Sequence, residues 1–147
     1  MAAPQLQAIE ADAAPGDRAQ TILLVEDNAD ARESLSVALT LEGYRVLAAA
    51  DGMAALDIVE RERPPLAVLD IGLPRMDGYE LARHIRAKSG PEVVLIALTG
   101  YGSESDTARS ADAGFDEHLT KPVDLNALMT VLDQLFADRR GSEVVRT

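Results

Sequence analysis

Polar residues follow four strand-like apolar runs of this sequence, and their chemical types suit phosphoryl chemistry. Asp70 ends the apolar run at 66–69. The other three runs end in further groups of this kind, namely Glu26 with Asp27, Thr99, and Lys121. Because the carboxyl ends of parallel strands lie along one edge of a sheet, where ligands bind, these groups are expected to converge. The mixture predicts a divalent cation held by oxygen ligands beside a residue that receives a phosphoryl unit, with the hydroxyl and amine binding its oxygens.

The elements that must position these groups alternate regularly along the chain. Strands are predicted at 21–25, 44–50, 66–70, 93–98 and 115–120, and a segment with helical spacing of apolar residues follows each of them. The fourth of these helices is expected at 103–114, and Asn28, Asp77 and Asp124 are expected to cap three of the others. Strict alternation of strands and helices predicts an α/β fold with a parallel sheet covered on both faces. The uninterrupted apolar strands agree with this double coverage.

Composition and charge limit the classes of protein to consider. The chain has 147 residues, of which 47% are hydrophobic, so it has room for one domain. We expect residues 1–19 and 138–147 to form flexible tails around a folded part at 20–137. No apolar run approaches the length of a membrane-spanning helix, and residues 1–19 do not read as a secretory signal, so a cytoplasmic location is expected. The net charge of −11 argues against a nucleic-acid surface.

Four motifs in order give the chain a family resemblance. They are LVEDN at 24–28, VLDIGLPRMDG at 68–78, ALTG at 97–100 and LTKP at 119–122. With them, the chain resembles the receiver domains of two-component response regulators over roughly residues 20–137. The resemblance implies a flavodoxin-like (βα)5 fold, doubly wound, with strand order 2-1-3-4-5. It also implies that Asp70 accepts a phosphoryl group from a phosphohistidine.

The resemblance also assigns a metal site and its neighbours. Mg²⁺ (or Mn²⁺) would be held by Asp27, Asp70 and the backbone carbonyl of Gly72, with Glu26 acting directly or through water. Many relatives carry Asp where this chain has Glu26. Crowded carboxylates repel one another, which should raise their pKa values unless a cation neutralises the cluster. Lys121 would pair with a phosphoryl oxygen, and the Thr99 hydroxyl would bond the attached group.

Further positions would govern switching and the lifetime of the modification. In relatives an aromatic residue three positions before the lysine moves with the threonine, and here that position is His118. Imidazole is smaller than a phenyl ring and titratable. The Lys121–Pro122 bond resembles a cis peptide of the family. Gly72 and Tyr101 occupy positions that tune dephosphorylation, and the bulk of Tyr101 is expected to shield the phosphoryl group.

The leading hypothesis for function is a phosphorylation-controlled signalling module. Its expected partners are a histidine kinase or a histidine phosphotransfer protein, together with a downstream protein that binds the fourth helix, fifth strand and fifth helix. It could be a single-domain regulator, a phosphate relay or sink, or the receiver of a hybrid kinase, acting by protein contact. One alternative is an aspartate-dependent phosphatase, but those enzymes generally carry a second Asp where this chain has Gly72. Another is a binding module that ignores phosphorylation. Beyond its own phosphorylation and slow dephosphorylation, we expect no enzymatic activity.

Overall fold

A five-stranded parallel sheet forms the centre of the molecule. The computed structural model describes residues 21–100 and 112–146. The strands are β1 (Thr21–Val25), β2 (Arg45–Ala49), β3 (Leu66–Asp70), β4 (Val94–Thr99) and β5 (Glu117–Thr120). They pair in the order β2-β1-β3-β4-β5, and every pair is parallel. The predicted flavodoxin-like strand order is therefore confirmed.

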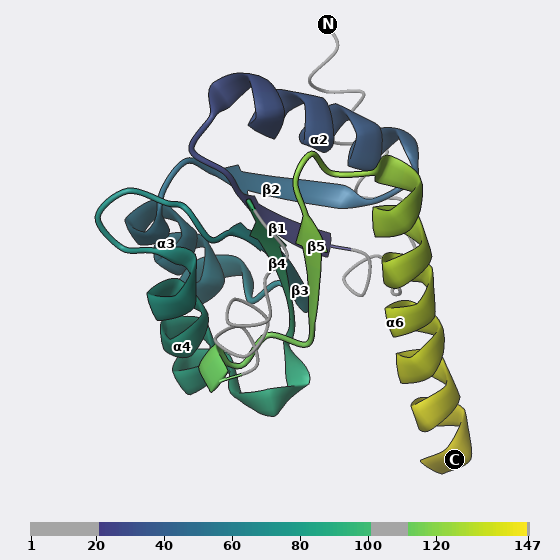
Figure 1. Cartoon of the computed structure of the whole chain (residues 1–147). Coiled ribbons are helices and arrows are strands. Elements are labelled where there is room, and N and C mark those ends of the chain that lie inside the picture. The colour runs from purple at the N-terminus through teal and green to yellow at the C-terminus, as the bar shows by residue number, and fades with distance from the viewer. Residues whose placement is uncertain (1–20, 101–111, 147) are drawn as a thin grey trace, which may run out of the picture.

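Helices cover both faces of the sheet. They are α2 (Ala29–Leu41), α3 (Gly52–Glu62), α4 (Gly78–Ser89) and α6 (Leu125–Arg146), and a short 3-10 helix, η2 (Gly90–Glu92), follows α4. Figure 1 shows α3 and α4 on one side of the sheet and α2 and α6 on the other. Two buried apolar clusters match these two layers, one including Leu81 and Ile85 of α4 and the other including Leu39 of α2 with Leu128 of α6.

The central strands are mostly apolar because both of their faces are covered. Every residue of β1, β3 and β4 is buried, including the polar Thr21, Asp70 and Thr99. The edge strand β5 is less buried than the central strands, because its first and last residues are exposed and its middle two are only partly buried. The buried polar residues at the ends of β3 and β4 therefore stand out from an otherwise apolar core.

Acidic and amide side chains begin the helices. Each accepts a hydrogen bond from a backbone N–H of the first helical turn, which would otherwise have no partner. The pairs are Asn28 with Ala31, Asp51 with Ala54, Asp77 with Glu80, and Asp124 with Asn126. The caps predicted at Asn28, Asp77 and Asp124 are thus confirmed.

One arginine ties the amino ends of β4 and β5 to α4. The Nη1 of Arg86 donates to the carbonyls of Gly90 and Val93, and its Nη2 donates to the carbonyl of Gly114 and lies 3.2 Å from Asp116 Oδ2. The same carboxylate oxygen accepts a hydrogen bond of 2.8 Å from the N–H of Leu95. Arg86 therefore holds the frame from which β4 and β5 run toward the opposite edge of the sheet.

Several boundaries differ from those predicted: β2 is one residue shorter at each end, β4 is displaced by one residue, and two differences are larger. The last strand begins at Glu117 rather than at 115, because Phe115 is buried against the edge of the Tyr79 ring at a centroid distance of 6.4 Å. Helix α6 continues to Arg146, through residues predicted to form a tail. Gly141 is the only strong helix breaker after residue 137, and one interior glycine costs about 1 kcal/mol without ending a helix.

The helix predicted at 103–114 lies mostly outside the described residues. Only Asp112 and Ala113 of that segment are seen in a helical conformation, followed by a turn at Gly114. In the part of the chain that the structure describes, no helix combines the length and apolar character needed to cross a membrane.

Candidate functional site

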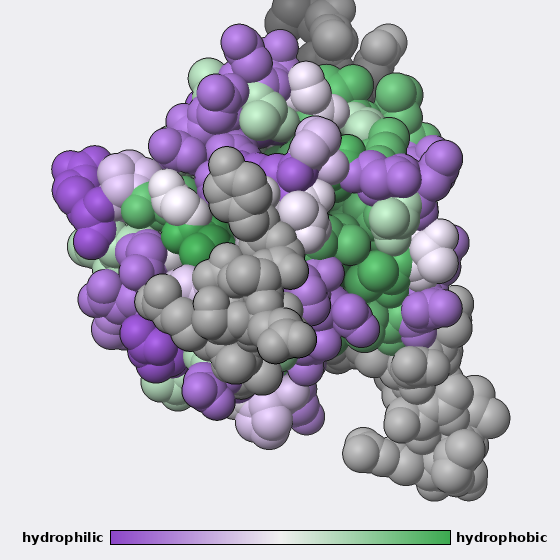
Figure 2. Space-filling view, in the orientation of Figure 1, coloured by the Kyte–Doolittle hydropathy of each residue, from purple (hydrophilic) through white to green (hydrophobic). Residues whose placement is uncertain are grey.

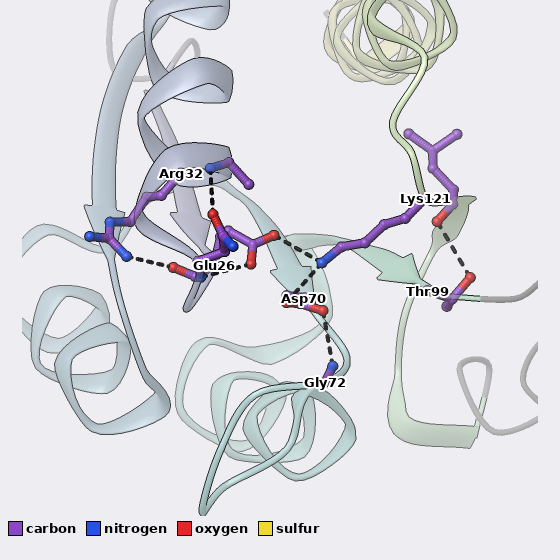
Figure 3. Close-up of polar contacts among 9 residues, drawn as sticks. Glu26, Arg32, Asp70, Gly72, Thr99 and Lys121 are labelled. Atoms are coloured by element: carbon purple, nitrogen blue, oxygen red, sulfur yellow. Dashed lines mark hydrogen bonds and ion pairs between the residues drawn. The ribbon is translucent and has the colours of Figure 1, made fainter.

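The polar groups predicted to converge lie at the carboxyl edge of the sheet, directly after β1, at the ends of β3 and β4, and directly after β5. The parallel register aligns the ends of these strands, pairing Val25 with Leu69 and Asp70 with Leu98. Glu26 follows β1 directly, and its N–H donates to the carbonyl of Ala49 at 3.1 Å. Figure 3 shows the side chains of Glu26, Asp70 and Lys121 pointing toward one another from these elements.

Lys121 connects the two buried carboxylates. Its Nζ lies 2.9 Å from Asp70 Oδ2 and 3.0 Å from Glu26 Oε1. The contact with Glu26 is an ion pair without the angles of a hydrogen bond, so Oε1 is buried with no hydrogen-bond partner. The backbone N–H of Lys121 donates to the Thr99 carbonyl at 2.7 Å, which fixes the start of its side chain beside the end of β4.

Backbone groups hold the two carboxylates in place. Asp70 Oδ1 accepts a hydrogen bond of 3.0 Å from the N–H of Gly72, and Glu26 Oε2 accepts one of 3.1 Å from the N–H of Asn28. Each bond turns the chain sharply after its strand. The carboxylates are therefore fixed by local structure as well as by the shared lysine.

Gly78 lets α4 approach the strand that carries Asp70. A Cβ at this position would lie 2.6 Å from the carbonyl oxygen of Asp70 and 2.7 Å from the Cα of Ile71. Both neighbours are backbone atoms, so they could not move aside at low cost. The N–H of Gly78 donates to the Ile71 carbonyl at 3.0 Å, which closes the loop between β3 and α4. A side chain here would displace the loop that positions Asp70.

Arg32 belongs to the same region, and the sequence did not predict its contact. Its Nη1 donates to the Glu26 carbonyl at 2.8 Å, bracing the turn between β1 and α2 from the first turns of the helix (Figure 3). Arg32 lies six residues after Glu26, and it falls in none of the four motifs. In the sequence, only its position in the first turns of a predicted helix could have indicated this contact. Many solvent-exposed arginines occupy similar positions, so the position alone does not identify it.

The three charged groups shift one another's pKa values. Burial raises the pKa of Glu26, although its hydrogen bond from Asn28 and its contact with Lys121 oppose that rise. Burial acts in the same direction on Asp70, but the hydrogen bonds from Lys121 and Gly72 outweigh it and lower the pKa of that carboxyl. For Lys121, burial favours the neutral amine, yet the contacts with Asp70 and Glu26 raise its pKa. The arrangement keeps Asp70 and Lys121 ionised at neutral pH.

The donor set fits a hard divalent cation. Carboxylate oxygens of Glu26, Asp27 and Asp70 all lie within 4.8 Å of one another. Two of these side chains are buried, whereas Asp27 is exposed and can reach a hydrated ion from the solvent side. Glu26 Oε1 contacts Lys121 but accepts no hydrogen bond, which agrees with a site that accommodates more positive charge than Lys121 alone supplies. Oxygen-only ligands with access to water suit Mg²⁺, which usually keeps several waters.

The remaining predicted residues lie at or near this edge. Thr99 is buried at the end of β4, and its hydroxyl donates to the Leu119 carbonyl at a long 3.5 Å. His118 is partly buried on β5, where it pairs with Ala97 of β4. The Lys121–Pro122 peptide bond is cis, as predicted. Tyr101 lies outside the described residues.

Known proteins share both this sequence pattern and this fold. Residues 22–133 match the response regulator receiver domain family. The response regulator MprA of Mycobacterium leprae is 42% identical over 115 residues, which make up 78% of this chain and 50% of the relative. The chain thus spans about half the length of the curated relatives it matches.

Solved structures extend the likeness to three dimensions. A CheY-like response regulator receiver domain from Methanospirillum hungatei superposes with a TM-score of 0.78 at 32% identity, covering 84% of this chain and 98% of that one. The receiver domain of the sensor histidine kinase PA1611 from Pseudomonas aeruginosa has a TM-score of 0.73 at 37% identity, covering 80% and 98% of the two chains. That structure holds a magnesium ion coordinated in its active-site cleft.

The family match covers most of the chain, and the relatives exceed 30% identity. The chain belongs to the response regulator receiver domain family. It is a receiver domain of a two-component system, as the resemblance implied.

Proposed function

We propose that Asp70 is the phosphoacceptor of this receiver domain, taking a phosphoryl group from a phosphohistidine. The observation that carries the proposal is the position of Lys121, whose Nζ lies within 3.0 Å of both Asp70 and Glu26 at the carboxyl edge of the sheet. This arrangement places an ionised nucleophile, a cation and a cluster of acidic oxygens in one site. Phosphoryl transfer needs these parts, because it depends mainly on positioning and on charge stabilisation.

The transfer step follows from the orientation of Asp70. A carboxylate oxygen forms a bond to phosphorus while the bond between phosphorus and the imidazole nitrogen breaks, and the histidine leaves after taking up a proton. The product is an acyl phosphate on Asp70. Oδ1 stays bonded to the N–H of Gly72, so the carboxylate keeps its orientation during the reaction. Lys121 exchanges its contact with Asp70 for one with a phosphoryl oxygen.

The acidic cluster provides the metal site. Asp27, Asp70 and the carbonyl of Gly72 are the proposed ligands, with Glu26 as a direct or water-mediated fourth group. Mg²⁺, or Mn²⁺ in its place, supplies positive charge that neutralises the carboxylates and the incoming phosphoryl oxygens. Glu26 is well placed for this role because its burial disfavours the carboxylate form unless a cation is near.

Thr99 and His118 form the proposed switch. Within the described residues the Thr99 hydroxyl makes a single long hydrogen bond, to the Leu119 carbonyl at 3.5 Å, so little is lost when the hydroxyl turns toward a phosphoryl oxygen. A phosphoryl group brings roughly 1.5 to 2 negative charges and strong acceptor oxygens. His118, next to Leu119 on β5, responds to the vacated space. Gly72 and Tyr101 tune how long the acyl phosphate survives.

The partners are a histidine kinase or a histidine phosphotransfer protein and a downstream protein. The surface for the latter comprises the helix predicted at 103–114 together with β5 and α6. Figure 2 shows hydrophobic atoms gathered over the region of α6 and the adjoining end of α2, and the exposed Leu125 of α6 contributes to the apolar surface. We place the receiver at residues 20–137 of a cytoplasmic protein that acts by protein contact, without binding nucleic acid and without a separate enzymatic activity.

The experiment is labelling with a small phosphodonor. Incubation with phosphoramidate and Mg²⁺ should add one phosphoryl group per chain, detected by intact mass, and EDTA should prevent it. Asp70→Asn should remove the label, whereas Asp77→Asn should keep it, because Asp77 caps α4 through its bond to Glu80. Sustained hydrolysis of many phosphate esters would instead indicate an aspartate-dependent phosphatase. Unlabelled protein under all conditions would overturn the proposal.

A further inference from the structure

Away from the candidate site, a polar hollow lies at the edge of the sheet opposite Asp70. Its volume is about 310 Å³, in the lower range of pockets that hold small ligands. Thr21 and Arg45 are the first residues of β1 and β2, and Pro65 directly precedes β3. The end of α3 supplies the other lining residues, Arg61, Glu62 and Arg63. The hollow is therefore separated from the site at Asp70 by the length of the strands.

Positive charge prevails in this hollow although the whole chain carries −11. Among the residues that the structure describes, three guanidinium groups and one carboxylate line it. The carboxylate of Glu62 lies 3.7 Å from Arg45, a loose ion pair whose side chains are 36% and 35% exposed. Arg61 pairs with Asp57 of the same helix at 3.3 Å. Within the described residues, no acidic group pairs with Arg63.

The backbone fixes Arg63 at the rim of the hollow. Arg63 ends α3 in a left-handed conformation with φ 48°, and its N–H donates to the Val59 carbonyl at 3.0 Å. A residue other than glycine is strained in this conformation, because its Cβ approaches the neighbouring carbonyl oxygen. Pro64 and Pro65 follow, and their rings restrict the backbone directly after it. The backbone at Arg63 is thus fixed at the rim of the hollow, in a conformation where glycine would be the less strained residue.

Interaction with the helix dipole explains only some of the arginines that line this hollow. Cations at the carboxyl end of a helix stabilise its dipole, and this accounts for Arg61 in the last turn of α3. It does not account for Arg45, which begins an edge strand rather than ending a helix. It also does not account for the convergence of both arginines with Arg63 on one hollow.

We propose that this hollow binds a phosphomonoester, with Arg45 and Arg63 as its principal ligands. Guanidinium groups bind phosphate oxygens through two parallel hydrogen bonds, and a phosphomonoester carries close to two negative charges at neutral pH. This charge is opposite in sign to the excess of arginine over glutamate among the described lining residues. The space beyond the phosphate admits a small organic group. The inference is independent of phosphoryl transfer at Asp70.

The test is a titration of the isotopically labelled chain followed by amide resonances, in EDTA so that the acidic site holds no metal. The probes are inorganic phosphate, ribose 5-phosphate, and ribose as the uncharged control. We expect saturable shifts at Thr21, Glu62 and Arg63 with both phosphates, stronger binding of the sugar phosphate, and none with ribose. Arg63→Gln should weaken binding roughly tenfold or more, as expected for lost hydrogen bonds to a charged group. Arg45→Gln should act in the same direction.

The matched control is Arg83→Gln, which removes one positive charge from the exposed face of α4, outside the hollow. This variant should bind both phosphates like the original chain. If Arg83→Gln weakened phosphate binding as much as Arg63→Gln, the effect would come from the overall charge of the protein, and the proposed site would be overturned. So would saturable shifts confined to the surroundings of Lys121, or no saturable shift at millimolar phosphate. Well-dispersed resonances of each variant, and unchanged labelling of Asp70 by phosphoramidate, separate these outcomes from misfolding.

Discussion

Replacing Lys121 with methionine should destabilise the metal-free protein by exposing the repulsion between two buried carboxylates. Methionine keeps the apolar stem and removes the ammonium group that contacts Asp70 at 2.9 Å and Glu26 at 3.0 Å. At an effective dielectric constant of about 20, each contact corresponds to about 6 kcal/mol of Coulomb energy before desolvation. Removing one partner of a buried pair costs about 3–5 kcal/mol. Because the Lys121 side chain is 32% exposed, solvent reduces this figure, and we expect a loss of about 2–3 kcal/mol.

Urea unfolding in EDTA at neutral pH measures this loss. Mg²⁺ should restore stability, and by more in Lys121→Met than in the original chain, because in the original chain Lys121 already neutralises the same carboxylates. At a concentration one hundredfold above its dissociation constant, the ion adds about 2.7 kcal/mol. Lys88→Met is the control, since Lys88 contacts Glu60 at 3.1 Å between side chains that are 45% and 67% exposed. Exposed pairs contribute at most about 1 kcal/mol.

The pH dependence of the variant gives a second readout. Without the ammonium group the two carboxylates repel each other. Protonation of one of them as the pH falls removes this repulsion and stabilises the variant. Burial already raises the pKa of Glu26 above 4.5, and that carboxyl should take up a proton first. The stability difference between the two proteins should therefore shrink in mildly acidic buffer. A variant as stable as the original chain in EDTA at neutral pH, or an equal response of both to Mg²⁺, would refute this reasoning.

Three further predictions concern other parts of the molecule. Arg86→Ala should lower the free energy of unfolding by about 2–4 kcal/mol, because it leaves several carbonyl acceptors without partners, while Arg83→Ala should change it by less than about 0.5 kcal/mol in the same urea titration. The contacts of Lys121 with Asp70 and Glu26 raise its pKa. The stabilisation that these contacts give the folded protein is therefore complete below pH 10.5 and disappears as the pH rises through the folded-state pKa. Urea midpoints in alkaline buffer should fall more for the original chain than for Lys121→Met. Tyr101→Ala should speed loss of the phosphoryl group by admitting water, and an unchanged lifetime in a time course of intact mass would contradict that shielding.

The alternation of apolar strands and helical segments was sufficient to predict a parallel α/β sheet covered on both faces, and the family resemblance supplied the strand order. Continuous runs such as 66–69 indicate strands buried on both faces, and Asn28, Asp77 and Asp124 mark helix starts through their capping chemistry. These signals are local, so a sequence displays them directly. The start of β5 was misplaced because Phe115 suits a strand and a core equally well, and its packing against Tyr79 decides the matter.

The candidate site was predictable in composition but not in its contacts. Strand ends and motif order pointed to Glu26, Asp70, Thr99 and Lys121, which the fold brings to one edge. The bridging position of Lys121 between two carboxylates depends on tertiary packing and left no mark in the sequence. Arg86 and its carbonyl partners were missed for the same reason, since Gly114 lies 28 residues further along the chain.

Identifying the residue that carries the phosphoryl group tests most directly whether Asp70 is the phosphoacceptor. After incubation with phosphoramidate and Mg²⁺, peptide mass spectrometry following reduction of the acyl phosphate should locate a single modification at Asp70. A modification at Asp27 or Asp51, or a label that persists in Asp70→Asn, would show that Asp70 is not the phosphoacceptor.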